Sequence, residues 1–184
     1  MVVEIMTRII AGKYKGQRIE VPQHGVRPTT DRVREAIFSV LAARLDSWED
    51  QVVLDIFAGS GGLGIEALSR GAAAATFLEK DRRNAEAISA NLKKVGAAGR
   101  VVVGAADQFA PTEQYSLVFL DPPFAIDDQY LISLLTNLAS AVRQGGLVLV
   151  ERGKQHKFSW PAGYSQLLER GYGDSLIFLA ERQD

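Results

Sequence analysis

The sequence has no cysteine among its 184 residues and only two histidines, His24 and His156. Without cysteine there can be no disulfide bond, no thiolate-bound zinc or iron–sulfur cluster, and no covalent attack on a pyrimidine ring carbon by a thiolate. The histidines belong to no cluster with metal-ligand spacing. We therefore expect an intracellular protein whose chemistry uses no metal.

Long apolar runs are also missing. No apolar segment reaches the ~20 residues of a membrane span, and Glu4 stands where a signal peptide would carry bases. The hydrophobic content of 47% and charged content of 23% are typical of a globular chain of one domain. We expect a cytoplasmic monomer with no membrane partner.

The net charge of −1 conceals an uneven distribution. Residues 1–34 carry seven bases and three acids, a net of +4, whereas the remaining 150 residues carry 14 bases and 19 acids, a net of −5. A basic arm on an acidic body fits a protein that holds a polyanion such as RNA at one end. A solvated surface hairpin explains the same charges, so both interpretations stay open at this point.

The hydrophobic pattern changes near residue 50. Before it, residues 7–21 alternate as a β-hairpin with a basic turn, and a helix begins at Thr29-Thr30-Asp31 and runs to about residue 45. After it, short apolar strands alternate with helices. The expected strands are 52–57, 75–79, 100–104, 116–120, 147–151, 164–170 and 175–181, and the expected helices are 62–70, 82–95 and 128–143, the last closed by Gly145-Gly146.

This order predicts an α/β fold with a Rossmann-like, mostly parallel sheet, an antiparallel C-terminal edge, and an N-terminal hairpin plus helix as an extension. We place the extension at residues 1–46 and the main domain at residues 47–184.

A glycine-rich loop, Gly59-Ser60-Gly61-Gly-Leu-Gly64, lies directly between a buried strand and a helix. Glycine at 59 and 61 lets the backbone turn tightly and approach a ligand. Glu79 ends the next strand, where an acid commonly accepts hydrogen bonds from ribose hydroxyls. These features together predict an adenosine-type cofactor.

Asp55 indicates which cofactor fits. It lies at the carboxyl end of the first strand of the alternating region, where its charge would repel a pyrophosphate but attract a cation. S-adenosylmethionine carries a sulfonium, an ammonium and no phosphate, so it suits Asp55 better than NAD does. Asp107, after the third strand, either accepts a hydrogen bond from the adenine amino group or is a loop residue or helix N-cap.

The segment Asp121-Pro122-Pro123-Phe124 follows another buried strand at the same end of the sheet. Two prolines stiffen this loop. The Asp121 carboxylate and the Pro122 carbonyl could accept both N–H bonds of an exocyclic amino group, concentrating electron density on its nitrogen for attack on a methyl group. Phe124 could stack on the extruded base.

Five segments together resemble the RsmD family, which methylates N2 of a guanine in 16S ribosomal RNA. They are Arg8-Ile-Ile-Ala-Gly12, Arg27-Pro-Thr-Thr-Asp-Arg-Val-Arg-Glu-Ala-Ile-Phe38, Leu54-Asp-Ile-Phe-Ala-Gly-Ser-Gly61, Glu66-Ala-Leu-Ser-Arg-Gly-Ala72 and Phe77-Leu-Glu-Lys-Asp81. Guanine, its N2 atom and the small-subunit ribosomal particle come from this resemblance alone. The sequence departs from the family at Ala105-Ala106-Asp107-Gln108, where Gly-Asp-Ala is usual.

With the resemblance, three sets of site residues are expected. The catalytic loop would be Asp121, Pro122, Pro123 and Phe124. The S-adenosylmethionine site would include Asp55, Phe57, Gly59, Ser60, Gly61, Glu79, Lys80, Asp107 and Thr30. The surface for 16S ribosomal RNA would include Arg8, Lys13, Tyr14, Lys15, Arg18, Arg27, Arg32 and Arg34.

Three rival functions remain open on the sequence. An adenine N6-methyltransferase uses the same Asp-Pro-Pro-aromatic chemistry, a nicotinamide-dependent oxidoreductase explains the glycine loop taken alone, and a non-catalytic RNA-binding module explains the basic arm. Glu151, at the end of a strand, is either a substrate-side acid or a salt-bridge partner, and the sequence does not assign it. Thr30, Arg32 and Arg34 either reach the cofactor or the RNA from the N-terminal helix, or are a helix cap and solvated charges.

Overall fold

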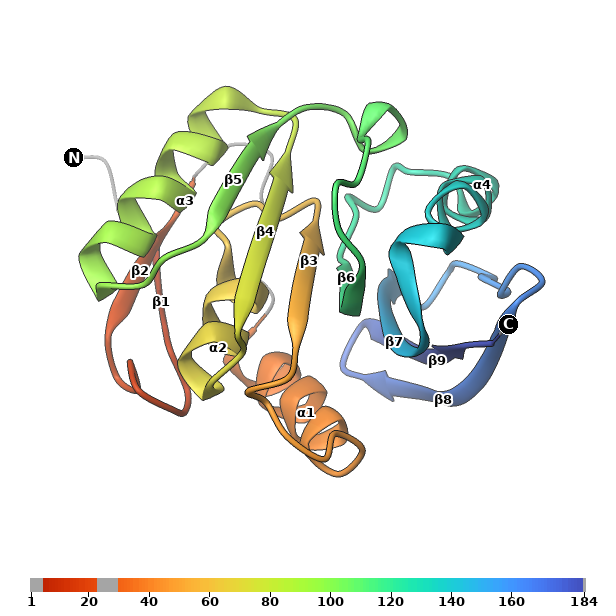
Figure 1. Cartoon of the computed structure of the whole chain (residues 1–184), viewed down its shortest axis with the longest axis horizontal. Helices are drawn as coiled ribbons and strands as arrows, with labels where there is room; N and C mark the ends of the chain where they lie inside the picture. The colour runs from red at the N-terminus through yellow and green to blue at the C-terminus, as the bar shows by residue number, and fades with distance from the viewer. Residues whose placement is uncertain (1–4, 23–29, 184) are drawn as a thin grey trace.

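In a computed structural model of the chain, residues 5–22 and 30–183 are described (Figure 1). The strands are β1 (Ile5–Arg8), β2 (Arg18–Val21), β3 (Val52–Ile56), β4 (Ala74–Glu79), β5 (Arg100–Val103), β6 (Tyr115–Leu120), β7 (Val142–Gly153), β8 (Tyr164–Tyr172) and β9 (Ser175–Arg182). The helices are α1 (Asp31–Ala42), α2 (Gly62–Arg70), α3 (Arg82–Val95) and α4 (Asp128–Asn137), with short 3₁₀ turns η1 (Ala106–Gln108) and η2 (Ala139–Ala141).

The main sheet has seven strands in the order β5-β4-β3-β6-β7-β9-β8. Strands β5, β4, β3, β6 and β7 run parallel, whereas β9 pairs antiparallel with both β7 and β8. The predicted parallel sheet with an antiparallel C-terminal edge is therefore confirmed. None of the helices in the described part of the chain is long and apolar enough to cross a membrane.

Two hydrophobic clusters lie on opposite faces of this sheet, as alternation along the strands requires. One contains Val53 and Phe119 together with side chains of α1, α2 and α3. The other contains Leu54 and Val118 together with side chains of α4. Both faces are thus covered by helices, which is why the central strands are apolar almost throughout.

The N-terminal hairpin packs against the first of these clusters. Strands β1 and β2 pair antiparallel and are joined by residues 9–17. The buried Glu66 of α2 accepts hydrogen bonds from the backbone N–H groups of Ile10 at 2.8 Å and Ala11 at 3.0 Å. Ile9 and Ile19 belong to the same buried cluster as Val53. The hairpin is therefore anchored on α2 through both buried polar and apolar contacts.

One predicted element is wrong in its extent. The helix expected over 128–143 ends at Asn137, and after η2 the chain enters β7 at Val142. Val142 pairs with Tyr115 of β6, and this pairing carries the chain into the sheet before the glycines. Gly145 lies within β7, where its φ of +73° accommodates the register shift, rather than closing a helix.

Candidate active site

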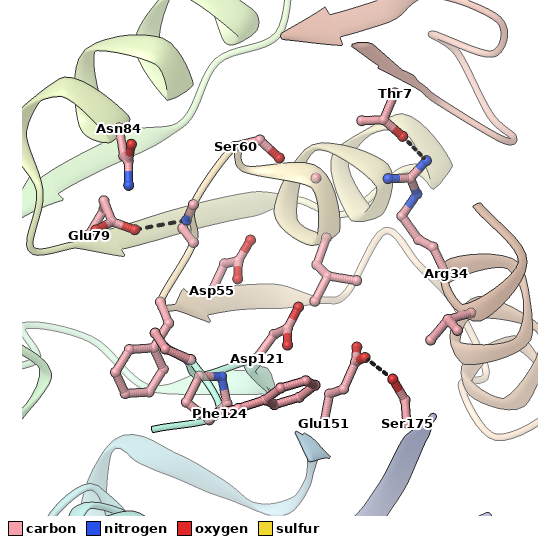
Figure 2. Close-up of a pocket in the computed structure, with 18 of the residues that line it drawn as sticks. Thr7, Arg34, Asp55, Ser60, Glu79, Asn84, Asp121, Phe124, Glu151 and Ser175 are labelled. Carbon is pink, nitrogen blue, oxygen red and sulfur yellow. Dashed lines mark hydrogen bonds between the residues drawn. The ribbon is translucent and has the colours of Figure 1, made fainter. Parts of the chain in front are cut away.

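A cavity of about 600 Å³ opens at the carboxyl ends of the parallel strands (Figure 2). Its walls come from the loop after β3, the end of β4, the loop after β6, the last residues of β7, and the starts of α1 and β9. The crevice outside the carboxyl ends of the strands is where ligands of such sheets bind. The volume is that of a typical small-molecule site.

The glycine loop forms one wall and is held by Glu79. The Glu79 carboxylate accepts hydrogen bonds from the backbone N–H groups of Gly59 and Asp81, both at 2.9 Å. Because each carboxylate oxygen can accept more than one hydrogen bond, Glu79 keeps capacity for a ligand. Phe57 adopts a φ of +63°, a strained conformation for a side-chain-bearing residue, at the point where the chain turns into the cavity.

Gly61 serves the turn rather than the cavity lining. It caps α2 with a φ of +78°, and a Cβ there would lie 3.2 Å from side-chain atoms of Ile65 and Ile88. It is absent from the residues that line the cavity, whereas Gly59 and Ser60 line it. The steric demand of the turn accounts for glycine at this position.

Asp55 lies at the base of the cavity and is 2% exposed. Its Oδ2 accepts a hydrogen bond from the backbone N–H of Gly64 at 2.9 Å. Burial raises the pKa of Asp55 to about 7; the Gly64 hydrogen bond opposes this rise, and the negative charge of Glu79 adds to it. A cation bound beside Asp55 would favour its charged form.

Arg34 lies in the wall of the cavity and not on the outer surface. Its side chain donates to Thr7 Oγ1 and Asp31 Oδ1, both at 2.9 Å, and burial lowers its pKa. Its Nε has no hydrogen-bond partner among the described residues. The prediction that Arg34 binds RNA is therefore wrong, because a guanidinium that is 2% exposed cannot meet a phosphate backbone at the surface. It is placed instead to meet an anionic group inside the cavity.

The Asp-Pro-Pro-Phe loop forms the wall opposite the glycine loop. All four of its residues, Asp121 to Phe124, line the cavity. The Pro123 carbonyl accepts a hydrogen bond from Ile126 N–H at 3.0 Å, and the Ile126 carbonyl in turn accepts one from the fully buried Arg152 at 2.5 Å. The loop is thus fixed from behind by a buried cation, and Phe124 is left partly exposed at the cavity mouth.

The remaining residues expected at the cofactor site divide into two groups. Thr30, Lys80 and Ser60 line the cavity. Asp107 lies outside its lining, in η1, where it accepts a hydrogen bond from the Tyr130 hydroxyl at 3.3 Å. Its contact with adenine stays a prediction. Within the described residues, no group of three or more histidines and carboxylates could hold a metal ion.

Several of the bases expected to hold RNA are exposed. Lys13, Lys15, Arg18 and Arg32 are exposed, and the Arg8 side chain is 70% exposed while pairing with Asp31 at 3.2 Å. Arg27 lies outside the described residues.

Tyr14 is not placed to stack on a base. It is 9% exposed, its backbone N–H donates to Ser69 Oγ, and its hydroxyl donates to the Gly96 carbonyl at 3.3 Å. The prediction that Tyr14 belongs to the RNA surface is therefore wrong, because its ring lies in the core beneath the hairpin.

Glu151 and Ser175 were not predicted as site residues, yet both line the cavity beside Asp121 (Figure 2). Glu151 is 5% exposed, and Ser175 Oγ donates to its Oε1 at 2.6 Å. The position of Glu151 at a strand end was the available signal. Ser175 had none, because an antiparallel strand distant in sequence brings it there.

The chain resembles known proteins over most of its length. A family model described as conserved hypothetical protein 95 matches residues 7–181. Ribosomal RNA small subunit methyltransferase D of Escherichia coli strain K12 is 46% identical over 121 residues, which are 64% of this chain and 60% of that protein. The protein of the same name from Haemophilus influenzae is 36% identical and covers 90% of this chain and 89% of its own length.

A solved structure shows the same architecture. The Escherichia coli protein yhhF superposes with a TM-score of 0.81 at 38% identity, covering 97% of this chain and 98% of that one. The Rossmann-like methyltransferase fold predicted from the sequence is confirmed by this likeness and by the strand order. The chain belongs to the conserved hypothetical protein 95 family, which is the RsmD family.

Proposed function

We propose that the protein transfers a methyl group from S-adenosylmethionine to the exocyclic N2 of a guanine in small-subunit ribosomal RNA. The observation that carries this proposal is the clamped Asp121-Pro-Pro-Phe124 loop, which faces an acid-lined glycine loop across one cavity. The names of the Escherichia coli and Haemophilus influenzae relatives support the RNA class.

The charged side chains that line the cavity are complementary to S-adenosylmethionine. Asp55 would favour the cationic part of the cofactor, and Glu79 would accept hydrogen bonds from the ribose hydroxyls. The buried Arg34, with an Nε that has no partner among the described residues, would hold the carboxylate. When bound, the cofactor supplies an electrophilic methyl group on a positively charged sulfur.

The loop residues prepare the acceptor nitrogen. An exocyclic amine is a weak nucleophile because its lone pair is delocalised into the ring. Hydrogen bonds from its two N–H groups to the Asp121 carboxylate and the Pro122 carbonyl localise that lone pair for attack. The nitrogen gains one methyl group and loses one proton, which passes to Asp121 or to water. Phe124, exposed at the mouth, would stack on the extruded base.

Residues 1–46 would act as the RNA-binding extension. Lys13, Lys15 and Arg18 are exposed on the connection and strand of a hairpin that Glu66 anchors firmly to α2. A rigidly mounted basic surface would position a phosphate backbone without reading its bases. We propose that the protein acts as a cytoplasmic monomer and that its partner is 16S ribosomal RNA within a small-subunit particle.

The proposal is tested by incubating the protein with methyl-labelled S-adenosylmethionine and unmodified small-subunit RNA, free and as assembled particles, and identifying the labelled nucleoside. N2-methylguanosine is expected, with the particle as the better substrate. N6-methyladenosine would keep the loop chemistry and overturn the guanine assignment. Absence of label on both substrates would overturn methyl transfer to this RNA altogether.

A matched variant separates chemistry from cofactor binding. Asp121→Ala should nearly abolish methyl transfer while the affinity for S-adenosylmethionine, measured by calorimetry, stays close to that of the wild type. Equal loss of both would make Asp121 a cofactor ligand and contradict its role on the amine.

A further inference from the structure

Glu151 is a buried carboxylate in the cavity wall that the methyl transfer described above does not use. It is 5% exposed, and the Ser175 hydroxyl fixes it through a hydrogen bond of 2.6 Å to Oε1. Figure 2 shows its carboxylate pointing into the cavity, on the same side as Asp121 and Phe124. Burying a carboxylate costs folding free energy unless hydrogen-bond donors surround it.

The sheet register places Glu151 next to the reacting amine. Leu120 of β6 pairs with Val150 of β7, so the following residues, Asp121 just after β6 and Glu151 within β7, lie side by side at the same level. Neighbouring strands are about 5 Å apart. A planar base whose amino group meets Asp121 would therefore present the adjoining atom of its ring edge to Glu151.

We propose that Glu151 reads the ring edge of the target base by accepting the N1–H of guanine. This inference rests on the proposed function, since it assumes that Asp121 and Pro122 hold the N2 amino group. N1 adjoins the carbon that bears N2 and carries a hydrogen in guanine, whereas N1 of adenine carries a lone pair. An ionised carboxylate only accepts hydrogen bonds, so it attracts the first and repels the second.

Glu151 thereby supplies a discrimination that the Asp-Pro-Pro-Phe loop lacks. The loop accepts hydrogen bonds from any exocyclic amino group, whether at position 2 or position 6 of a purine. One acceptor facing N1 separates the two purines, and a base contact of this kind changes the preference by about 10- to 100-fold. Ser175 is a positioning residue here, because its hydroxyl donates to Oε1 and orients the carboxylate.

The test uses a base that differs from guanine in hydrogen bonding at N1 and keeps the reactive group. The guanine that the wild type methylates is first mapped and then replaced with 2,6-diaminopurine in a synthetic RNA. This base retains the 2-amino group but has a lone pair at N1. It also carries a 6-amino group in place of the carbonyl, so the methylated nitrogen is identified and only the N2-methyl product is counted in the rates. The wild type should methylate guanine RNA about 10- to 100-fold better in kcat/KM. Glu151→Gln should narrow or reverse this preference, because the amide N–H can donate to N1.

Two controls isolate the effect. Glu169→Gln changes an exposed carboxylate of β8 outside the cavity and should keep the wild-type preference. The affinity of Glu151→Gln for S-adenosylmethionine, measured by calorimetry, should match that of the wild type.

Four outcomes are decisive. A preference for guanine in the wild type that collapses in Glu151→Gln supports the proposal. Equal wild-type rates on the two RNAs overturn it while the proposed function stands, and this measurement needs no variant to fold. A variant that loses activity on both RNAs in equal proportion reduces Glu151 to a structural role. Methylation of adenine alone by the wild type would overturn the proposed function together with this inference.

Discussion

Asp55→Asn tests whether the buried carboxyl group of Asp55 in the cavity has a raised pKa. Burial raises the pKa of Asp55 from 3.8 to about 7, a change of about 3 units, which corresponds to about 4 kcal/mol. Between pH 4 and pH 7 the unfolded chain has released this proton and the folded protein has kept it. The folded state binds more protons in that window, so the free energy of unfolding falls as pH rises and levels off above pH 7.

The asparagine has nearly the same shape, stays neutral, and can still accept the hydrogen bond from Gly64 N–H. We therefore expect Asp55→Asn to be more stable than the wild type at pH 8, by up to about 4 kcal/mol, and to show no gain near pH 4. Urea unfolding of the cofactor-free protein at several pH values, followed by tryptophan fluorescence, measures the difference. Asp46→Asn, which changes an exposed carboxylate, serves as the control.

The affinity for the cofactor should rise with pH, whereas the free energy of unfolding falls. A cationic ligand requires Asp55 to be ionised, so the wild-type affinity for S-adenosylmethionine should rise with pH up to about 7 and then level off. Asp55→Asn should bind more weakly at pH 8 and lack this dependence. A stability difference that is the same at pH 5 and pH 8 would show that Asp55 titrates normally, and the reasoning would be refuted.

Three further predictions concern the parts that hold the site together. Replacing the fully buried Arg152 with Met should lower the free energy of unfolding by about 3 kcal/mol and reduce kcat with little change in cofactor affinity; unchanged kcat would remove Arg152 from loop positioning. Glu66→Ala should cost about 3 kcal/mol in urea unfolding, because two backbone N–H groups and Arg70 lose their acceptor. Changing Lys13, Lys15 and Arg18 together to Gln should weaken RNA binding and flatten its log–log salt dependence by about two units in a filter-binding series; an unaltered slope would contradict the proposed RNA surface.

The strand and helix order could be predicted because its signals are local. The apolar run Val52–Ile56 and the glycine that follows α3, Gly96, each mark their element within a few residues. The end of α4 could not be predicted, because the apolar pattern of the helix continues to Val142. What carries Val142 into β7 is its pairing with Tyr115, a partner 27 positions away.

The cavity was predictable where a motif lies at the carboxyl end of a strand. Asp55, Glu79 and Asp121 all meet this condition, and all three line the cavity. Tyr14 and Arg34 were predicted at the RNA surface from their residue type alone, and both are buried. For Arg34, helical spacing predicts burial, because position 34 shares a helix face with Ile37, Phe38 and Leu41, three, four and seven residues later.

The strand order also explains why one cavity can serve two ligands. Glu79, Asp55, Asp121 and Glu151 lie at the carboxyl ends of β4, β3, β6 and β7, which are consecutive in the sheet. The first two lie beside the glycine loop, where we propose that the cationic cofactor binds, and the last two lie in or beside the Asp-Pro-Pro-Phe loop, where we propose that the amino group binds. Crossing from β3 to β6 is the point where the connection order of the sheet reverses, and a crevice opens there in folds of this kind. In the proposed function, the same reversal separates the acids assigned to the methyl donor from those assigned to the acceptor.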